Sequence, residues 1–206
     1  EDGKLNQHDA SVKIGEILKS LYIDSALKRQ EKVDYFYINS YHFDSKLLKN
    51  YSYPINTNDL PSNLEKFSSF NSDFKTKFIE LINPEISFDF LGGLYLSVFR
   101  KNNWDKNLNK LNQKNLNNNL LFSNIDNTYP HIKIFSYAFK NSEAYFCSKA
   151  LSINLFGVRE WTSLYPIVRS VRSVDALNFY YKNGLPLTKL LKYKNYALQY
   201  FLPDVL

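Results

Sequence analysis

The longest apolar run in this chain, residues 86–99, is interrupted by Asp89 and by the pair Gly92-Gly93. A helix that spans a bilayer needs about 20 predominantly apolar residues, and no stretch of the sequence approaches that length. The hydrophobic residues, 44% of the 206, are instead distributed among polar ones. The sequence therefore predicts a chain that does not span a membrane and that buries its apolar side chains in one large domain or two small ones.

The composition says more about the kind of partner than about the kind of fold. Aromatic residues make up 17% of the chain, Met is absent, and Lys and Asn recur throughout. AT-rich codons produce this mixture, so part of it reflects a genome or an organelle. A net charge of +6 and an isoelectric point near 9.1 favour a polyanionic partner, because each Lys or Arg that meets a phosphate releases condensed counterions. The single cysteine, Cys147, excludes an internal disulfide, and we expect it to be a buried thiol.

The first part of the chain has the pattern of a mostly helical region with irregular segments. We expect an amphipathic helix over residues 9–30, a strand over 33–38, a loop over 49–73 with one short helix at 63–70, a helix over 73–82, and a buried segment over 86–99 that fits a strand or a helix. Residues 100–119 alternate Lys and Asn, with Leu at intervals. They fit a polar helix with a thin apolar stripe or a low-complexity surface insertion, and their lysines could contact phosphate or simply face solvent.

The last third alternates between strand and helix patterns. We expect a strand at 131–139, a helix at 142–153, an extended stretch at 161–171, a helix at 175–182 that stops at Asn183-Gly184, and a basic helix or turn at 189–194. This order predicts an α+β fold, with a small mixed sheet and packed helices in the C-terminal third and a mostly helical N-terminal part. We place a division between a helical or irregular region at 1–119 and an α+β domain at 125–206.

No complete catalytic or metal-binding motif occurs in the sequence. The three histidines, His8, His42 and His131, are far apart, whereas metal sites need clustered ligands. A Gly-x-Ser-x-Gly nucleophile motif is missing, and the glycine pair at 92–93 is not followed by Lys-Ser or Lys-Thr. We therefore expect no enzymatic activity, no metal, no cofactor and no small-molecule substrate.

One segment has an enzymatic resemblance. Asp175-Ala-Leu-Asn-Phe-Tyr-Tyr-Lys-Asn-Gly-Leu resembles the closing segment of acetyl-coenzyme A dependent acetyltransferases, in which Asn-x-x-Ala-x-x-Phe-Tyr-x-x-x-Gly-Phe ends a helix before the last strand. That family holds the cofactor pyrophosphate in a loop rich in Gly and Arg. The preceding residues here, Leu155-Phe-Gly-Val-Arg-Glu-Trp, contain one glycine. An acetyltransferase-like protein therefore stays an alternative that lacks a cofactor-binding loop.

Basic residues concentrate toward the end of the chain and alternate with aromatic ones. Lys and Arg supply phosphate contacts, and planar rings stack on unpaired bases. We expect most of the aromatic side chains to belong to the core, with Tyr181 or Tyr193 as candidates for contact. The predicted nucleic-acid-binding residues are Arg159, Arg169, Arg172, Lys182, Lys189, Lys192 and Lys194, with Arg100 and Lys101 as further candidates.

Residues 172–197 resemble the C-terminal domain of the third small-subunit ribosomal protein family, in a divergent mitochondrial (organellar) form. That family has a Gly-Arg-Leu turn, a helix that contains Ala and ends Tyr-Arg-x-Gly, a Pro-Leu-His-Thr-Leu segment and an Ile-Asp-Tyr-Ala element. Residues at nearly matching positions here are Ala176, Tyr181-Lys182, Gly184, Pro186-Leu187, Thr188 or Leu190, and Tyr196-Ala197. The Gly-Arg-Leu turn is not intact at 169–174, the His is missing, and no Gly-x-x-Gly loop of a KH domain is present.

The resemblance implies a structural constituent of the mitochondrial small ribosomal subunit, located in the matrix, with rRNA and neighbouring ribosomal proteins as partners. Residues 157–160 and 165–166 also resemble the fifth large-subunit ribosomal protein family, and Trp161-Thr162 resembles the tenth small-subunit family. These likenesses compete for the same residues. A further alternative is an accessory subunit of an organellar assembly, which would bind protein instead of RNA.

Overall fold

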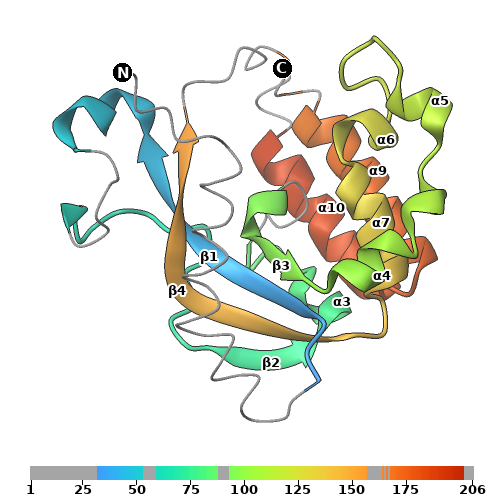
Figure 1. The fold of residues 1–206 in the computed structure, drawn as a ribbon, viewed down its shortest axis with the longest axis horizontal. Helices are drawn as coiled ribbons and strands as arrows, with labels where there is room; N and C mark the ends of the chain where they lie inside the picture. The colour runs from blue at the N-terminus through green and yellow to red at the C-terminus, as the bar shows by residue number, and fades with distance from the viewer. Residues whose placement is uncertain are drawn as a thin grey trace. The chain divides into compact units, whose positions relative to one another are not determined.

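The computed structural model describes residues 32–52, 59–87, 93–156, 164, 166 and 168–201, and its fold is drawn in Figure 1. The chain divides into two compact units, Glu1–Val33 and Asp34–Leu206. The first unit lies almost entirely outside the described residues, and so does the helix expected over residues 9–30. The second unit contains the elements described below.

Within the described residues, one mixed sheet runs through the second unit in the strand order β2-β4-β1-β3. Its strands are β1 (Tyr35–Asp44), β2 (Phe74–Lys77), β3 (Ser97–Phe99) and β4 (Glu143–Phe156). β1 lies parallel to β4 and antiparallel to β3, and β2 lies antiparallel to β4. The predicted α+β class is confirmed.

The sheet is not confined to the C-terminal third, because β1, β2 and β3 all come from residues before 100. The expected division between 1–119 and 125–206 falls inside the unit Asp34–Leu206. Parallel pairing of β1 with β4 joins the two halves, from Tyr35 opposite Ala144 to Asp44 opposite Phe156. Pairing between strands about a hundred residues apart leaves no mark in the local sequence pattern.

A buried asparagine stabilises the point where the pairing of β1 with β4 shifts register. The register changes between Ile38 and Ser40, and Asn39, between them, is fully buried. Its Nδ2 donates to the carbonyls of Ser68, at 2.9 Å, and Ser148, at 3.1 Å. Its Oδ1 accepts from the backbone nitrogens of Ser40 and Ser68, both at 3.0 Å. The amide therefore satisfies backbone groups that the interrupted ladder leaves unpaired.

Most of the described helices lie on one face of the sheet, as Figure 1 shows. The longest are α7 (Pro130–Ala138), α9 (Ser173–Lys182) and α10 (Leu187–Phe201), and the shorter ones are η2 (Ser45–Asn50), α3 (Phe78–Leu81), η5 (Leu94–Leu96), α4 (Lys101–Asp105), η6 (Leu108–Lys110), α5 (Gln113–Leu116), α6 (Ile125–Thr128) and the π-helix η8 (Val168–Arg172). None of the described helices combines the length and the apolar character that a membrane span requires.

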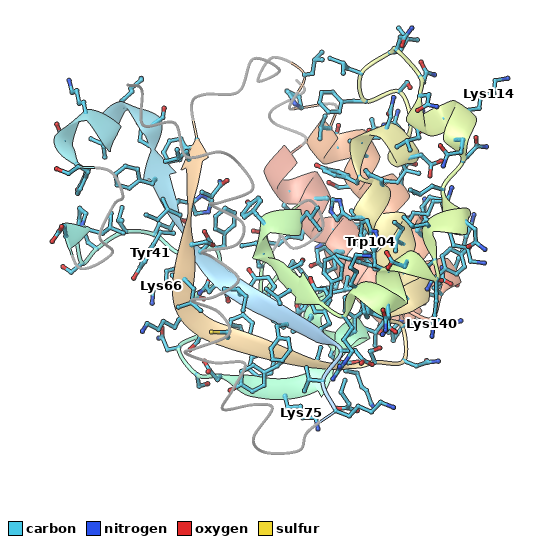
Figure 2. All side chains as sticks on the ribbon, viewed as in Figure 1. Tyr41, Lys66, Lys75, Trp104, Lys114 and Lys140 are labelled. Atoms are coloured by element: carbon cyan, nitrogen blue, oxygen red, sulfur yellow. The ribbon has the colours of Figure 1, made fainter. Side chains whose placement is uncertain are left out.

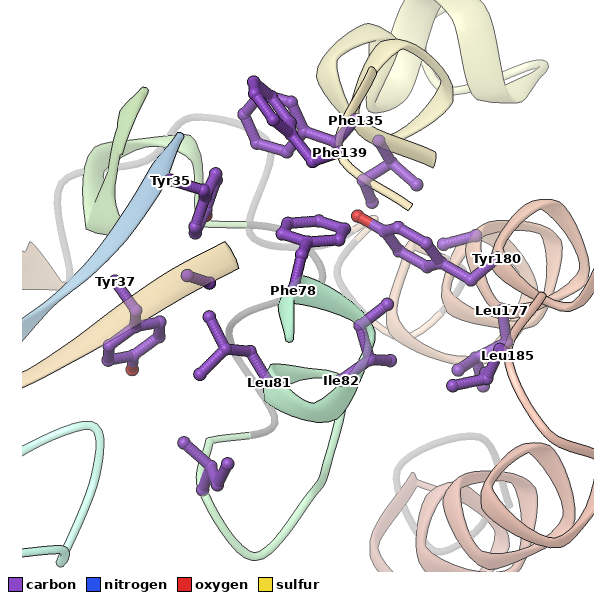
Figure 3. Close-up of a cluster of buried hydrophobic side chains, with 14 of the residues drawn as sticks. Tyr35, Tyr37, Phe78, Leu81, Ile82, Phe135, Phe139, Leu177, Tyr180 and Leu185 are labelled. Atoms are coloured by element: carbon purple, nitrogen blue, oxygen red, sulfur yellow. The ribbon is translucent and has the colours of Figure 1, made fainter. Parts of the chain in front are cut away.

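Aromatic rings from the sheet and the helices meet in the core, as Figure 3 shows. Tyr35 of β1 lies edge-on to Phe78 of α3, with ring centroids 4.8 Å apart, and to Phe135 of α7 at 5.5 Å. Phe78 also contacts Tyr180 of α9 at 6.0 Å. Edge-to-face pairs of this kind add about 0.5–1.5 kcal/mol each beyond the burial of their area. The core therefore joins β1, α3, α7 and α9 through a single aromatic cluster.

Two expected elements in the last third are exchanged. The strand expected at 131–139 is helix α7, and the helix expected at 142–153 is strand β4. Pro130 occupies the first turn of α7, where its missing N–H costs nothing and its fixed φ favours helix. Residues 143–146 of β4 alternate between half-buried and buried, which is the strand period of two.

The other expected elements agree only in part with the structure. The strand expected at 33–38 is the start of β1, and residues 73–82 form β2 followed by α3 in place of one helix. No helix forms at 63–70, and the described end of the 86–99 segment is η5 followed by β3. The described end of the expected extended stretch, 168–171, belongs to η8.

The expected helix over 175–182 is confirmed as α9, and the basic segment after it is helix α10. Gly184 has a φ of +112°, a value that residues with a Cβ rarely adopt. The amide of Leu185 donates to the carbonyl of Tyr180 at 3.0 Å. The chain therefore leaves α9 through a left-handed glycine, as the Asn-Gly pair predicts.

Candidate nucleic-acid interface

Arg172, one of the predicted RNA contacts, is held inside the protein by three groups of its own chain. Its Nε donates to the carbonyl of Phe122 at 2.8 Å, and one terminal nitrogen donates to that of Ser123 at 2.9 Å. The other terminal nitrogen forms an ion pair with Asp175. The side chain is only 16% exposed. Arg172 therefore joins the start of α9 to the turn before α6, and its guanidinium is not presented to a partner.

Two predicted contacts on α10 form ion pairs with acids from another part of the fold. Lys189 pairs with Glu80 of α3, and Lys192 Nζ lies 2.6 Å from Glu85 Oε1. The carboxylates are 49% and 62% exposed. Lys192 lowers the pKa of the Glu85 carboxyl below its ordinary value, by a hydrogen bond first and by its charge second. Exposed pairs contribute about 0–1 kcal/mol, so a phosphate could compete for both lysines.

Arg100 and Lys101 are also paired within the chain. Arg100 Nε lies 2.8 Å from Asp34 Oδ1, and Lys101 Nζ lies 2.6 Å from Asp105 Oδ2. The side chains of Lys101 and Asp105 are 83% and 41% exposed, so the second pair lies at the surface.

The structure describes only some of the remaining predicted contacts. Lys182 is exposed, with its Nζ 5.9 Å from the ring centroid of Phe179, and Lys194 is half-buried on α10. Arg159 and the side chain of Arg169 lie outside the described residues. Of the two candidate rings, Tyr193 is fully buried, with its hydroxyl 3.3 Å from the carbonyl of Ser87, which corrects its assignment as a stacking residue. Tyr181 is 45% exposed.

The Lys- and Asn-rich segment is neither a single polar helix nor a featureless insertion. It forms the short helices α4, η6 and α5. Trp104 anchors α4 to the core, because its ring stacks on Phe99 at 5.3 Å and meets the edge of Phe135 at 5.7 Å. α4 and η6 pack against α7, and α5 packs against α6.

Asparagine side chains hold the rest of this segment in place. Asn112 Oδ1 accepts from the backbone nitrogen of Asn115 at 3.2 Å and so caps α5. Asn124 and Asn127 form a reciprocal capping box at the start of α6, with both bonds at 3.2 Å. Asn127 Nδ2 also donates to the carbonyl of Leu120 at 2.8 Å. The asparagines therefore satisfy backbone groups at helix ends and turns.

The positive charge of the chain is concentrated in residues 100–140. These residues include seven Lys or Arg and two Asp, so they carry +5 of the net charge of +6. Both acids are already paired, Asp105 with Lys101 and Asp126 with Lys133. Among the described residues, four exposed lysines of this segment have no carboxylate within ion-pair distance: Lys106, Lys110, Lys114 and Lys140.

These four lysines and Tyr137 belong to the consecutive helices α4, η6 and α5 and to α7 with the residues just after it, and we call this set the lysine strip. Figure 2 labels Lys114 near α5 and Lys140 beyond the end of α7, with Trp104 between their labels. Lys110 of η6 places its Nζ 5.0 Å from the ring centroid of Tyr137 of α7, and that ring is 36% exposed. Cations on a surface without competing acids attract a polyanion, so this strip is the strongest candidate interface in the described residues.

The sequence pattern alone does not decide whether the lysines of residues 100–119 contact phosphate or face solvent. The signal that could have identified them is the ratio of cations to acids in residues 100–140. The pairing of the C-terminal lysines could not be foreseen in the same way, because their partners Glu80 and Glu85 lie more than a hundred residues earlier in the chain.

Cys147 and His131 are both buried. Cys147 is 1% exposed, and burial, followed by the charge of Asp73, raises the pKa of its thiol to about 11. His131 is 6% exposed, and burial lowers its pKa to about 4. Among the described residues, no three His, Cys, Asp or Glu side chains gather as metal ligands.

Comparison with known proteins identifies no relative of this chain: no family model, no curated protein and no solved structure matches it.

Proposed function

We propose that this protein is a structural constituent of a ribosomal small subunit, that of the mitochondrion, and that it holds folded rRNA in place. The observation that carries the proposal is the concentration of +5 of the net +6 charge in residues 100–140. Phosphate groups are the partner that such a surface attracts most strongly, since each contact releases counterions. Positioning RNA needs shape and charge, and it needs no catalytic group.

The C-terminal resemblance gives independent support to the ribosomal assignment. Helix α9 contains Ala176 and ends at Lys182, and the chain then turns at Gly184. This arrangement agrees with a helix ending Tyr-Arg-x-Gly, and it agrees equally with the helix that the acetyltransferase motif ends. Lys182, Lys189, Lys192 and Lys194 remain proposed phosphate contacts, with Lys189 and Lys192 exchanging exposed carboxylate partners for phosphate.

The acetyltransferase alternative is less favoured by the local structure. In that family the helix ending with this motif is followed by the last strand of the sheet. Here the segment after Gly184 continues as helix α10. A thermal-shift titration with acetyl-coenzyme A tests this alternative directly, because a cofactor that binds only the folded state raises the melting temperature.

The decisive experiment for the proposed function is purification of the native protein under conditions that preserve ribosomes, followed by sequencing of the RNA that accompanies it. Small-subunit rRNA and other small-subunit ribosomal proteins are expected in equal molar amounts. Recovery of the chain in a protein assembly without rRNA would overturn the proposal in favour of an accessory subunit.

A further inference from the structure

We infer that the lysine strip binds an unpaired segment of RNA, with phosphates along the lysines and a base stacked on Tyr137. The inference rests on the proposed function, because it names the part of the RNA that this surface recognises. It also relocates the main contact from the C-terminal helices to the layer formed by α4, η6, α5 and α7.

The lysines of the strip can bind phosphate without leaving a carboxylate partner. Four lysines of the strip are exposed: Lys106, Lys110, Lys114 and Lys140. Both acids of residues 100–140 are paired with other lysines, Asp105 with Lys101 and Asp126 with Lys133. Phosphates that approach the strip therefore displace only water and counterions from its lysines. Lys189 and Lys192 would first have to leave their carboxylate partners, so the strip is the more favourable site.

The ring of Tyr137 lies next to a lysine of the strip. Tyr137 is 36% exposed, and Lys110 Nζ lies 5.0 Å from its ring centroid. Lys110 Nζ lies over the face of this ring, so a base that stacks on Tyr137 takes the place of the ammonium, which then binds the adjoining phosphate. A stacked ring beside a cation is the combination that proteins use for single strands. The bases of an A-form duplex are already stacked on one another and cannot reach the ring. The strip therefore favours unpaired RNA over a duplex.

The helices that carry the strip are held in place by contacts within the chain. Trp104 anchors one end in the core, and the capping asparagines hold α5 and α6. Asn115 Nδ2 reaches Asp126 Oδ2 at 3.3 Å, and Asp126 in turn pairs with Lys133 of α7. A surface held by its own hydrogen bonds loses little conformational entropy on binding.

The experiment uses the full chain and two labelled probes, a single-stranded oligouridylate of about 12 nucleotides and an RNA duplex of equal length, titrated at several salt concentrations. A quadruple variant replaces Lys106, Lys110, Lys114 and Lys140 with Gln. A second variant is Tyr137→Ala. Circular dichroism and thermal unfolding establish that each variant is folded.

Single-strand binding is expected to be tighter than duplex binding. The quadruple variant is expected to bind at least tenfold more weakly and to lose up to about three units of the salt slope, since each phosphate contact on a single strand contributes about 0.7. Tyr137→Ala is expected to weaken binding about tenfold, the effect of losing one stacked base.

A matched control exists on a different surface. Lys66 Nζ lies 6.0 Å from the ring centroid of Tyr41, so Lys66→Gln and Tyr41→Ala remove the same types of group from a similar pair, which Figure 2 labels together. Both are expected to bind RNA as the unaltered protein does. An equal loss of binding in these controls would overturn the assignment of the strip.

A further variant separates failure of the inference from failure of the proposed function. It carries Lys182→Gln, Lys192→Gln and Lys194→Gln. If only this variant loses RNA binding, the proposed function stands and the strip is not the site. If the unaltered protein binds neither probe but binds an acidic protein or vesicles with 30% phosphatidylserine through the strip, both proposals are overturned. Equal affinity for the duplex and the single strand, together with no effect of Tyr137→Ala, would overturn the inference that the strip recognises unpaired RNA.

Discussion

Lys133 and Asp126 form an ion pair that is almost completely removed from solvent. Lys133 Nζ lies 2.9 Å from Oδ1 and 3.1 Å from Oδ2 of the carboxylate, and the two side chains are 15% and 2% exposed. The lysine also lies 5.5 Å from the ring centroid of Phe179 on α9. The pair therefore joins α6 to α7, and Asp126 Oδ2 also accepts from Asn115 Nδ2 of α5 at 3.3 Å.

Removal of the carboxylate should destabilise the fold strongly. In Asp126→Ala the ammonium of Lys133 stays buried without its counter-charge, which costs about 3–5 kcal/mol of unfolding free energy. The measurement is urea denaturation at neutral pH. Asp105→Ala is the matched control, because Asp105 pairs with the 83% exposed Lys101 and its loss should cost about 0.5 kcal/mol or less. Equal effects of the two substitutions would contradict the structural role of Asp126.

Arg172→Ala should reduce stability without acting on RNA directly. Its guanidinium satisfies the carbonyls of Phe122 and Ser123, and hydrogen bonds from a charged group contribute about 1.5–3 kcal/mol each. Chemical denaturation should show a loss of at least about 2 kcal/mol, with the salt slope of RNA binding unchanged. Lys182→Ala, at an exposed site, should leave stability within about 0.5 kcal/mol. A reduced salt slope in folded Arg172→Ala would show that the arginine contacts phosphate after all.

The thiol of Cys147 should be unreactive in the folded protein. Burial and the charge of Asp73 raise the pKa of Cys147 to about 11, so very little thiolate exists at pH 7, and the side chain is 1% exposed. Thiolate is the reacting species. Labelling with a disulfide reagent should therefore proceed only as fast as the chain unfolds and should become immediate in 6 M urea. Rapid stoichiometric labelling of the native protein would contradict the burial of Cys147.

Stability should fall between pH 6.5 and pH 4 through His131. Burial lowers the pKa of His131 to about 4 from an ordinary value of 6.5. In this interval the unfolded chain binds a proton that the folded chain does not, so the free energy of unfolding decreases by up to about 1.4 kcal/mol per pH unit as the pH falls. Above pH 6.5 the imidazole is neutral in both states and this contribution is fully present.

The test compares urea denaturation across this pH interval in the unaltered protein and in His131→Gln. The substitution should flatten the pH dependence of stability. His42→Gln serves as the control, since it removes an imidazole that stacks on Phe67 at a half-exposed position. A pH dependence that is the same in His131→Gln and in the unaltered protein would refute the assignment.

The sequence alone predicted features that depend on neighbouring residues. Helix α9 and its end at Gly184 follow from a local apolar pattern and an Asn-Gly pair. The burial of Cys147 follows from the apolar character of its segment. The charge excess of residues 100–140 is likewise a property of the sequence, although its lysines had no assigned role before the structure showed which acids were engaged.

The tertiary structure decided whatever depends on partners far away in the chain. Residues 143–156 are a strand because β1 lies beside them, and residues 130–138 are a helix because one face packs against the aromatic core. The same holds for charge: Lys189 is paired with Glu80, 109 residues away. Hydrogen bonds between strands and ion pairs between helices are made across space, so a local pattern can show which groups need a partner and cannot show which partner the fold supplies.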